Sequence, residues 1–275
     1  MGSVLERGVV AAYSAVASAT MAVPPKRTSC PQFVARVAGV RDLSPMFRRV
    51  TLDAPELETL ERLGADEYVG LFMPRPGVPV QLPPAGDNPR GELTRVPEDV
   101  RPDLRWYTIR AQRGSQIDID IVNSAHDGPG ARWTRAVRPG DEVGVRVQGA
   151  LYAGAPAGGH QVLLADETGL PGLLAILEAH PDRALTALVE VPTAEFVHDE
   201  VVAAGVPVVL RGDSAPGSAL LAELEQAIVA PIDYAWVCAE AGTIAACRRH
   251  LVKQRGVSRR AVMASGFWRV GAPRP

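Results

Sequence analysis

The stretch Arg105-Trp106-Tyr107-Thr108-Ile109-Arg110 decides the interpretation of this chain, because it sets a cation, aromatic rings and a hydroxyl along a strand-like run. About twenty residues later, Gly128-Pro129-Gly130-Ala131-Arg132-Trp133 has the pattern of a Gly/Pro turn that opens a helix. An aromatic ring and a hydroxyl suit the face and edge of a flavin, and the N–H groups that begin a helix bind phosphate oxygens. In this order, the two stretches predict a flavin dinucleotide site.

Composition limits the class of protein. The 275 residues allow two modest domains, and contents of 47% hydrophobic and 22% charged residues are typical of a globular protein. A formal net charge of −2 gives no sign of nucleic-acid binding, and no run is long enough to span a bilayer. Three cysteines without a C-x-x-C pair predict reduced thiols and a cytoplasmic protein, and five scattered histidines predict no metal site.

The first half of the chain has the pattern of a β domain. Residues 116–122 alternate strictly, with isoleucines at 117, 119 and 121 and aspartates at 118 and 120. Residues 74–103 are so rich in Pro and Gly that we expect a long loop. Further strands are expected at 33–40, 47–52, 68–73, 104–111 and 143–147, with a helix over 129–137. Short strands with one helix predict a small antiparallel β-barrel.

The second half changes to apolar strands that alternate with helices. The strands are expected at 162–165, 185–189, 206–210, 235–238 and 261–264, and the helices at 171–179, 193–203, 217–228 and 241–254. This alternation predicts a five-stranded parallel sheet that is covered on both faces and binds a nucleotide at the carboxyl ends of its strands. The expected division is a flexible extension over 1–30, a flavin-binding barrel over 31–152, a Gly/Ala linker over 153–160 and an α/β nucleotide-binding domain over 161–275.

With these blocks in this order, the chain resembles the siderophore-interacting protein family of FAD-dependent ferric-siderophore reductases, within the ferredoxin–NADP reductase superfamily. The resemblance runs from about Phe33 to Gly271. Its other carriers are the stretches 44–51, 138–141, 165–168 and 236–240, and Ala264-Ser265-Gly266-Phe267-Trp268-Arg269. The resemblance implies FAD as cofactor, NADPH or NADH as electron donor and a ferric siderophore as substrate.

The resemblance also implies roles for particular residues. Tyr107 would stack on the flavin ring, Thr108 would bond its edge and Arg105 would pair with the pyrophosphate. Thr108 and Trp268 would be the catalytic contacts, with Trp268 near the entry of the nicotinamide. Thr134 or Arg132 would replace a phosphate-binding serine of the family. The remaining FAD-binding candidates are Trp106, Asp120, Val122, Asn123, Gly128, Pro129, Gly130, Ala131 and Trp133.

On the nucleotide side, the ends of the parallel strands carry the candidates. Thr168 and Gly169 would meet the pyrophosphate of the nicotinamide dinucleotide, beside Asp166. Arg211 would meet the 2′-phosphate of NADPH, and Glu240 would lie near the nicotinamide. Basic residues that could attract an anionic chelate are Arg48, Arg49, Arg110, Arg248, Arg249, Arg259, Arg260 and Arg269.

Two other functions remain open, because the chain departs from the family pattern on the flavin side at Val122-Asn123-Ser124-Ala125 and at Val147-Gln148-Gly149-Ala150. One is an FAD-binding enzyme of secondary-metabolite biosynthesis that acts on a small organic molecule, with redox or structural flavin. The other is a binding protein that has lost cofactor turnover. In each case we expect a small-molecule ligand, no nucleic-acid or membrane partner, and a monomer or weak dimer.

Overall fold

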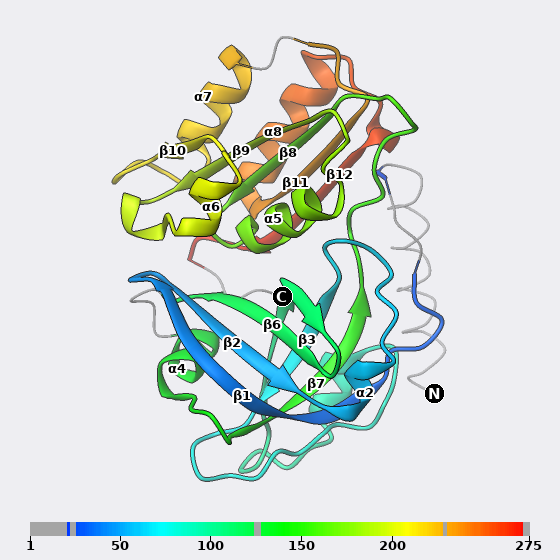
Figure 1. The fold of residues 1–275 in the computed structure, drawn as a ribbon, viewed down its shortest axis with the longest axis vertical. Helices are drawn as coiled ribbons and strands as arrows, with labels where there is room; N and C mark the ends of the chain where they lie inside the picture. The colour runs from blue at the N-terminus through cyan, green and yellow to red at the C-terminus, as the bar shows by residue number, and fades with distance from the viewer. Residues whose placement is uncertain (1–20, 23–25, 124–127, 228–229, 272–275) are drawn as a thin grey trace.

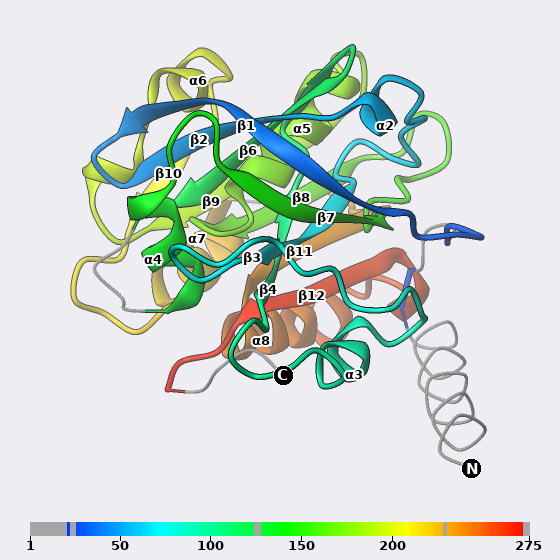
Figure 2. The same ribbon diagram turned by 90° about the horizontal axis from the view of Figure 1, so that it is seen from below.

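A computed structural model describes the chain except residues 1–20, 23–25, 124–127, 228–229 and 272–275. It contains two sheets, one antiparallel and one parallel, that lie one above the other along the long axis of the molecule (Figure 1). Figure 2 looks along that axis, with the antiparallel strands in front. No helix among the described residues is both long and apolar enough to cross a bilayer.

The antiparallel sheet closes on itself as a barrel. Its strand order is β4-β3-β7-β1-β2-β6-β5, so the two edge strands, β4 and β5, are neighbours in the chain. Only Ile109 and Arg110 separate them, and the Arg110 N–H donates to the Asp118 carbonyl at 2.8 Å, which joins the end of β4 to β6. The strands are β1 (Gln32–Ser44), β2 (Phe47–Asp53), β3 (Tyr68–Met73), β4 (Asp103–Thr108), β5 (Ala111–Arg113), β6 (Gln116–Val122) and β7 (Glu142–Gly149). The helices of this half are α2 (Pro55–Glu58), α3 (Pro89–Leu93) and α4 (Pro129–Ala136).

Strand β6 shows how the alternating pattern builds the barrel. Ile117, Ile119 and Ile121 lie in the barrel core, as their spacing predicts. Asp118 and Asp120 on the other face are also buried. Arginine side chains pair with both carboxylates, which are therefore not exposed to water. This face of β6 lies inside the protein.

The parallel sheet has the order β10-β9-β8-β11-β12 and is covered on both faces. On β8, Leu163 and Ala165 pack toward α5 and α6, whereas Val162 and Leu164 pack toward α7 and α8. The strands are β8 (Gln161–Asp166), β9 (Leu185–Val191), β10 (Val208–Leu210), β11 (Tyr234–Glu240) and β12 (Val262–Trp268). The helices are α5 (Leu170–Ala179), α6 (Asp199–Ala203), α7 (Ser218–Ala227) and α8 (Ala241–Lys253), with 3₁₀ turns η1 (Ala194–Phe196) and η2 (Arg259–Ala261). The expected fold class, a barrel followed by a five-stranded parallel sheet, is confirmed.

Local expectations failed at three places. The Pro-rich segment 74–103 is not wholly a loop, because Asn88 caps the short helix α3 and Pro89 starts it. The helix expected over 193–203 is split into η1 and α6, since Val197 and His198 are extended and Phe196 turns into the core shared by the two halves. The strand expected over 104–111 ends at Thr108, where the chain bends to close the barrel.

The two halves are joined through a buried hydrogen bond and a shared apolar cluster. Trp236 of β11 donates its indole N–H to Asp66 at 2.9 Å, and the same carboxylate accepts from the backbone of Leu151 and Tyr152. Burial raises the pKa of Asp66. Phe47 of the barrel packs edge-on against Phe196, with 6.2 Å between the ring centroids. These contacts fix the barrel against the side of the parallel sheet that α5 and α6 cover (Figure 1).

Ion pairs reinforce that junction. Arg49 of β2 bonds Asp120 and reaches across to Glu200 of α6 at 2.8 Å. Arg110 bonds Glu178 of α5 at 2.6 Å and the same Glu200 at 2.7 Å. Because the two arginines are almost fully buried, these pairs are screened less than surface pairs.

Parts of the expected extension 1–30 lie outside the described residues, and the rest contacts the body. Ala22 is buried and its N–H donates to the Val262 carbonyl at 3.3 Å. Arg27 pairs with the buried Glu67. The segment expected to be a linker is also bonded to the parallel-sheet domain. The Gln161 side-chain oxygen accepts hydrogen bonds from the Tyr152 hydroxyl and from the Ala155 N–H.

Candidate flavin and nucleotide site

The two stretches that predict a flavin dinucleotide meet in the structure. Gly130 in the first turn of α4 lies directly against the Tyr107 hydroxyl, so close that a Cβ at this position would fall within 3.0 Å of it. The same Cβ would lie 3.7 Å from Arg105 Cγ. Burial raises the pKa of Tyr107 to about 12, so its phenol stays protonated near neutral pH. The guanidinium, the phenol and the helix N-terminus therefore share one small region.

The first turn of α4 has no side-chain cap among the described residues. Gly128 caps the helix without any side-chain hydrogen bond, and Pro129 occupies the first position. The N–H groups of Gly130 and Ala131 precede the first intrahelical bond, which Arg132 donates to the Gly128 carbonyl. Thr134 does not replace the missing serine here, because its buried hydroxyl donates to the Gly130 carbonyl at 2.7 Å.

A second cation, Arg90 of α3, adds to this region and was not found from the sequence. Burial lowers its pKa, and the charge of Arg105 lowers it further, so the two guanidinium groups repel each other. Arg90 Nη2 is buried and has no hydrogen-bond partner among the described residues. Two cations within electrostatic reach of each other are suited to an anionic group such as a pyrophosphate. The Pro-rich composition of 74–103 concealed this signal.

A groove of about 1030 Å³ lies between α4 and the Pro-rich segment. Pro129 and Trp133, both predicted cofactor-binding residues, line it together with Arg132 and residues 73–80. Its size lies at the upper end of the range for small-molecule sites. The groove therefore has room for the adenosine half of a dinucleotide beside the candidate phosphate-binding residues.

Thr108, the residue directly after Tyr107, faces the boundary between the two domains. A cavity of about 40 Å³ is lined by Tyr68, Trp106, Tyr107, Thr108, Leu151, Ser265 and Phe267. Thr108 is buried and lies close to Gly172 of α5. A flavin ring is much larger than this cavity, so only an edge of the ring can reach Thr108 with the side chains in these positions.

The three predicted residues at the end of β6 have different surroundings. Asp120 is bound by Arg49 and is not open to a ligand. Val122 packs against the shared apolar cluster. Asn123 Oδ1 is buried and has no hydrogen-bond partner in the described part of the chain. A bound ligand could supply that partner. Residues 124–127, which include the nearest histidine, lie outside the described residues.

The structure brings Phe267, and not Trp268, to the flavin string. Successive residues of a strand point to opposite faces, and Phe267 lines the cavity beside Thr108. Trp268 instead donates its indole N–H to Asp166 Oδ2 at 2.7 Å. Phe267 was missed because the alternation of β12 cannot be assigned to a face without its neighbours.

Asp166 ties the ends of three parallel strands together. Its Oδ1 accepts from the backbone and hydroxyl of Thr168 and from the Gly169 N–H, and its Oδ2 accepts from Trp268 and from the Glu240 N–H at 2.8 Å. Burial and the neighbouring Glu167 raise the pKa of Asp166 to about 6, against the opposing effect of its donors. The N–H groups expected to hold a nucleotide phosphate are thus already bonded to this carboxylate.

Arg211 and Glu240 are similarly engaged. Arg211 forms a two-pronged ion pair with Glu167, both contacts at 2.9 Å, and lies 3.5 Å from Glu190. Glu240 caps α8 through the N–H groups of Gly242 and Thr243. The described residues hold no cluster suited to a metal ion.

Of the eight arginines considered for attracting a chelate, few share a surface. Arg48 pairs with Asp42, and Arg49 and Arg110 are engaged at the domain junction. Arg248, Arg249 and Arg259 line a groove between α8 and β12. These six arginines therefore do not share one surface.

The fold is that of proteins that join an FAD-binding β-barrel to an α/β domain with a parallel sheet. The sequence matches the family descriptions "Siderophore-interacting FAD-binding domain" over residues 36–149 and "Siderophore-interacting protein" over residues 159–271. The chain belongs to the siderophore-interacting protein family.

Solved structures and curated relatives agree with this membership. A siderophore utilization protein from T. fusca has 30% sequence identity and a TM-score of 0.74, covering 90% of this chain and 97% of that one. The siderophore-interacting protein SipS from Aeromonas hydrophila has 27% identity and a TM-score of 0.72, covering 89% and 94%. The ferric vibriobactin reductase ViuB of Vibrio cholerae is 25% identical over 83% of this chain and 86% of its own length. With an uncharacterised protein of Mycobacterium tuberculosis, at 29% identity, the match spans only 56% of either chain.

Proposed function

We propose that this protein is an NAD(P)H-dependent, FAD-containing reductase of ferric siderophores. The observation that carries the proposal is the close approach of Arg105 and Tyr107 of β4 to the first turn of α4, directly next to Thr108 at the domain boundary. A flavin dinucleotide needs an anion site and a ring site side by side. The ferric-reductase activity named for ViuB supports the choice of substrate.

The side chains would share the work of holding the cofactor. Arg105, Arg90 and the N–H groups of Gly130 and Ala131 would bind the pyrophosphate, and Tyr107 would lie against the ring. Trp133 would line the adenosine end. FAD, when bound, supplies the transfer of two electrons from the nicotinamide and their delivery, one at a time, to Fe(III).

At the domain boundary, Thr108 would bond the edge of the ring. Phe267, from the opposite domain, would cover the ring where the nicotinamide enters. Trp268 would act as a positioning residue, because its bond to Asp166 holds the end of β12 that carries Phe267.

A second function is favoured by one observation. The polar groups at the carboxyl ends of the parallel strands already bond one another. Asp166 occupies the N–H groups of Thr168 and Gly169, and Glu167 occupies Arg211. Buried carboxylates disfavour the phosphates of a pyridine nucleotide. An FAD-binding enzyme of secondary metabolism, acting on a small organic substrate without a nicotinamide donor, would explain this arrangement. For either function we propose a cytoplasmic monomer or weak dimer.

An anaerobic absorbance experiment distinguishes the two. Purified protein loaded with FAD is scanned alone, after NADPH or NADH, and again after a ferric hydroxamate or catecholate. The proposed reductase loses its flavin absorbance with one nucleotide and regains it with the ferric chelate. Flavin absorbance that persists with both nucleotides contradicts the reductase and supports the second function.

A further inference from the structure

The choice between NADH and NADPH depends on the adenosine end of the nucleotide, where NADPH carries a 2′-phosphate and NADH a hydroxyl. The parallel sheet has the strand order of dinucleotide-binding domains, because β9 and β10 lie on one side of β8 and the chain then crosses to β11 on the other side. In that order, an acidic residue about twenty residues after the first turn bonds the 2′-hydroxyl of NAD, or an arginine nearby receives the 2′-phosphate of NADP. The residues at the ends of β8, β9 and β10 therefore bear on the choice of donor.

Glu190 and Arg211 occupy those two places, and Arg211 is already paired. Glu190 lies near the end of β9, about twenty residues after the turn at Gly169, and Arg211 follows β10. Both terminal nitrogens of Arg211 donate to the Glu167 carboxylate at 2.9 Å, and Nη1 also lies 3.5 Å from Glu190. The side chains of Arg211 and Glu167 are each only 8% exposed. A phosphate could bind Arg211 only by breaking this buried ion pair, which leaves the carboxylate without its partner.

The described residues at these strand ends carry a net negative charge. The carboxylates of Asp166, Glu167 and Glu190 lie near one guanidinium, and the exposed Asp213 follows Arg211 two residues later. Burial lowers the pKa of Arg211, but the bond to Glu167 and the charges of the three carboxylates raise it overall. Glu190 is fully buried and acts on a ligand through its charge. A 2′-phosphate, with a charge of about −1.5 to −2, is repelled here, whereas a 2′-hydroxyl can donate to a carboxylate.

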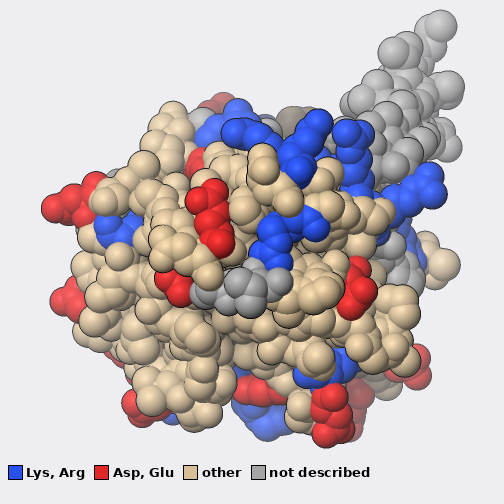
Figure 3. Space-filling view, turned by 90° about the horizontal axis from the view of Figure 1, so that it is seen from above, with Lys and Arg blue, Asp and Glu red and all other residues tan. Residues whose placement is uncertain are grey.

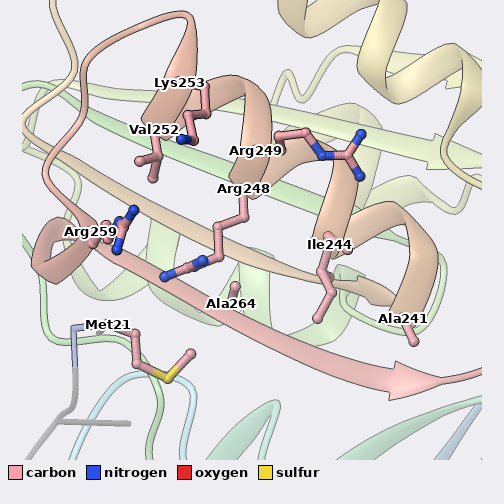
Figure 4. A pocket seen from close by; sticks show the side chains of 10 residues that line it. Met21, Ala241, Ile244, Arg248, Arg249, Val252, Lys253, Arg259 and Ala264 are labelled. Carbon is pink, nitrogen blue, oxygen red and sulfur yellow. The ribbon is translucent and has the colours of Figure 1, made fainter. Parts of the chain in front are cut away.

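Other cations of this domain lie at the far edge of the sheet. Arg248 and Arg259 line a groove between α8 and β12 (Figure 4). Strands β12 and β10 are the two edges of the sheet and, at about 4.8 Å per strand, lie about 19 Å apart. Figure 3 shows that Lys and Arg side chains gather along one side of a face of the molecule and are not spread evenly over it. The two arginines of the groove therefore do not replace Arg211 as partners of a phosphate.

We propose that the parallel-sheet domain binds NADH in preference to NADPH, and that Glu167 sets this preference. Glu167 holds Arg211 in an ion pair and adds its own charge where the 2′-phosphate would lie. This preference rests on the proposed reductase function, whose electron donor it names. The 2′-phosphate takes no part in hydride transfer, so the preference is one of binding and can be measured without turnover.

Titration calorimetry with two nucleotide fragments measures the preference directly. ADP-ribose contains the adenosine end and the pyrophosphate of NADH, and 2′-phospho-ADP-ribose adds only the phosphate. With FAD-loaded protein in about 0.1 M NaCl, we expect ADP-ribose to bind at least about tenfold more tightly. The ratio should fall in about 1 M NaCl, because salt screens the repulsion. Neither fragment has a nicotinamide, so the result does not depend on reduction of the flavin.

Two variants that each remove one negative charge test the role of Glu167. Glu167→Gln loosens the hold on Arg211 and should tighten binding of 2′-phospho-ADP-ribose about tenfold, with a change of less than about twofold for ADP-ribose. Asp182→Asn is the matched control, because the exposed Asp182 precedes β9 at the opposite end of that strand. It should leave both affinities unchanged. Urea unfolding confirms that each variant is folded, and the comparison of the two fragments on the wild type needs neither variant.

Equal affinities of the wild type for the two fragments, or tighter binding of the phosphorylated one, would overturn the preference. Equal effects of Glu167→Gln and Asp182→Asn would overturn the role of Glu167. Anaerobic reduction of the bound flavin separates the preference from the function itself. Faster reduction by NADPH than by NADH contradicts only the preference, whereas no reduction by either, together with no binding of either fragment, contradicts the proposed reductase as well.

Discussion

Replacing Gly130 by alanine tests the meeting of the two flavin stretches most directly. The added methyl group would lie within 3.0 Å of the Tyr107 hydroxyl, whereas ordinary contacts of a Cβ begin at about 3.4 Å. The phenol or the first turn of α4 must therefore move by at least several tenths of an ångström. Both belong to the proposed flavin site, so the displacement falls on the cofactor contacts.

The size of the effect follows from the geometry. Overpacking of this kind costs about 1–3 kcal/mol. The overlap involves the end of one side chain, which can turn aside, so we expect the apoprotein to lose only about 1 kcal/mol of stability. FAD binding should weaken about tenfold to a hundredfold, since about 1.4 kcal/mol corresponds to a factor of ten.

The assay is titration of flavin-free protein with FAD, followed by flavin fluorescence, together with urea unfolding of the apoprotein. Gly128→Ala is the matched control, because no described residue lies within 4 Å of a Cβ there. A second change, Tyr107→Phe, removes the overlapping oxygen and leaves Cζ 3.6 Å from the new methyl group. The double variant Gly130→Ala/Tyr107→Phe should therefore bind FAD more tightly than Gly130→Ala alone.

Equal FAD affinities for Gly130→Ala and Gly128→Ala would refute the reasoning, because the contact between α4 and β4 would then lie outside the cofactor site. Failure of Tyr107→Phe to recover any affinity would refute the steric explanation. A large loss of stability without loss of affinity in the folded protein would assign Gly130 to folding only.

Three further predictions separate neighbouring roles. Trp268→Phe removes a donor to Asp166 and should lower the free energy of unfolding by about 1 kcal/mol, with a smaller loss of flavin affinity than Phe267→Leu causes. Urea unfolding and FAD titration check both variants, and a larger loss of flavin affinity in Trp268→Phe would contradict the assignment. Because burial raises the pKa of Asp166 from 3.8 to about 6, the folded state holds that proton more tightly, and up to about 3 kcal/mol of stability present below pH 4 is lost as pH rises through 6. Because the pKa of Asp66 is raised as well, unfolding curves from pH 4 to 7 should show a steeper loss of stability in the wild type than in Asp166→Asn. Equal slopes would show that Asp166 titrates normally. Glu200→Gln breaks the ion pair with Arg49 across the junction and should destabilise by about 1 kcal/mol at low salt, with a smaller loss in about 1 M NaCl; a salt-independent loss would point to packing instead.

Much of the fold could be predicted because the chain repeats a local pattern. The period-two pattern of 116–122 and the apolar strands after residue 161 each need only their own residues to be recognised. The limits of elements were less predictable. Phe196 interrupts a helical pattern because its ring packs against Phe47, which is far away in the sequence. Tertiary packing overrode local preference at that point.

The candidate site also has a part that the sequence predicted and a part that only the structure showed. The string ending at Tyr107 and Thr108 and the turn at Gly130 were visible as residue types in order. The contribution of Arg90 was hidden in a Pro-rich segment, and its role depends on the charge of Arg105 nearby. Sequence order alone could not bring these two cations together.

By itself, the sequence determined the two-domain plan and the flavin string, since both depend on local periodicity and on residue chemistry. Only the tertiary structure decided which side chains remain open to a ligand. It turned Phe267 rather than Trp268 toward Thr108, and it engaged Arg211 with Glu167 instead of leaving it for a phosphate. The physical reason is that a buried charge or N–H group must find a partner, and partners are supplied by strands far apart in the chain.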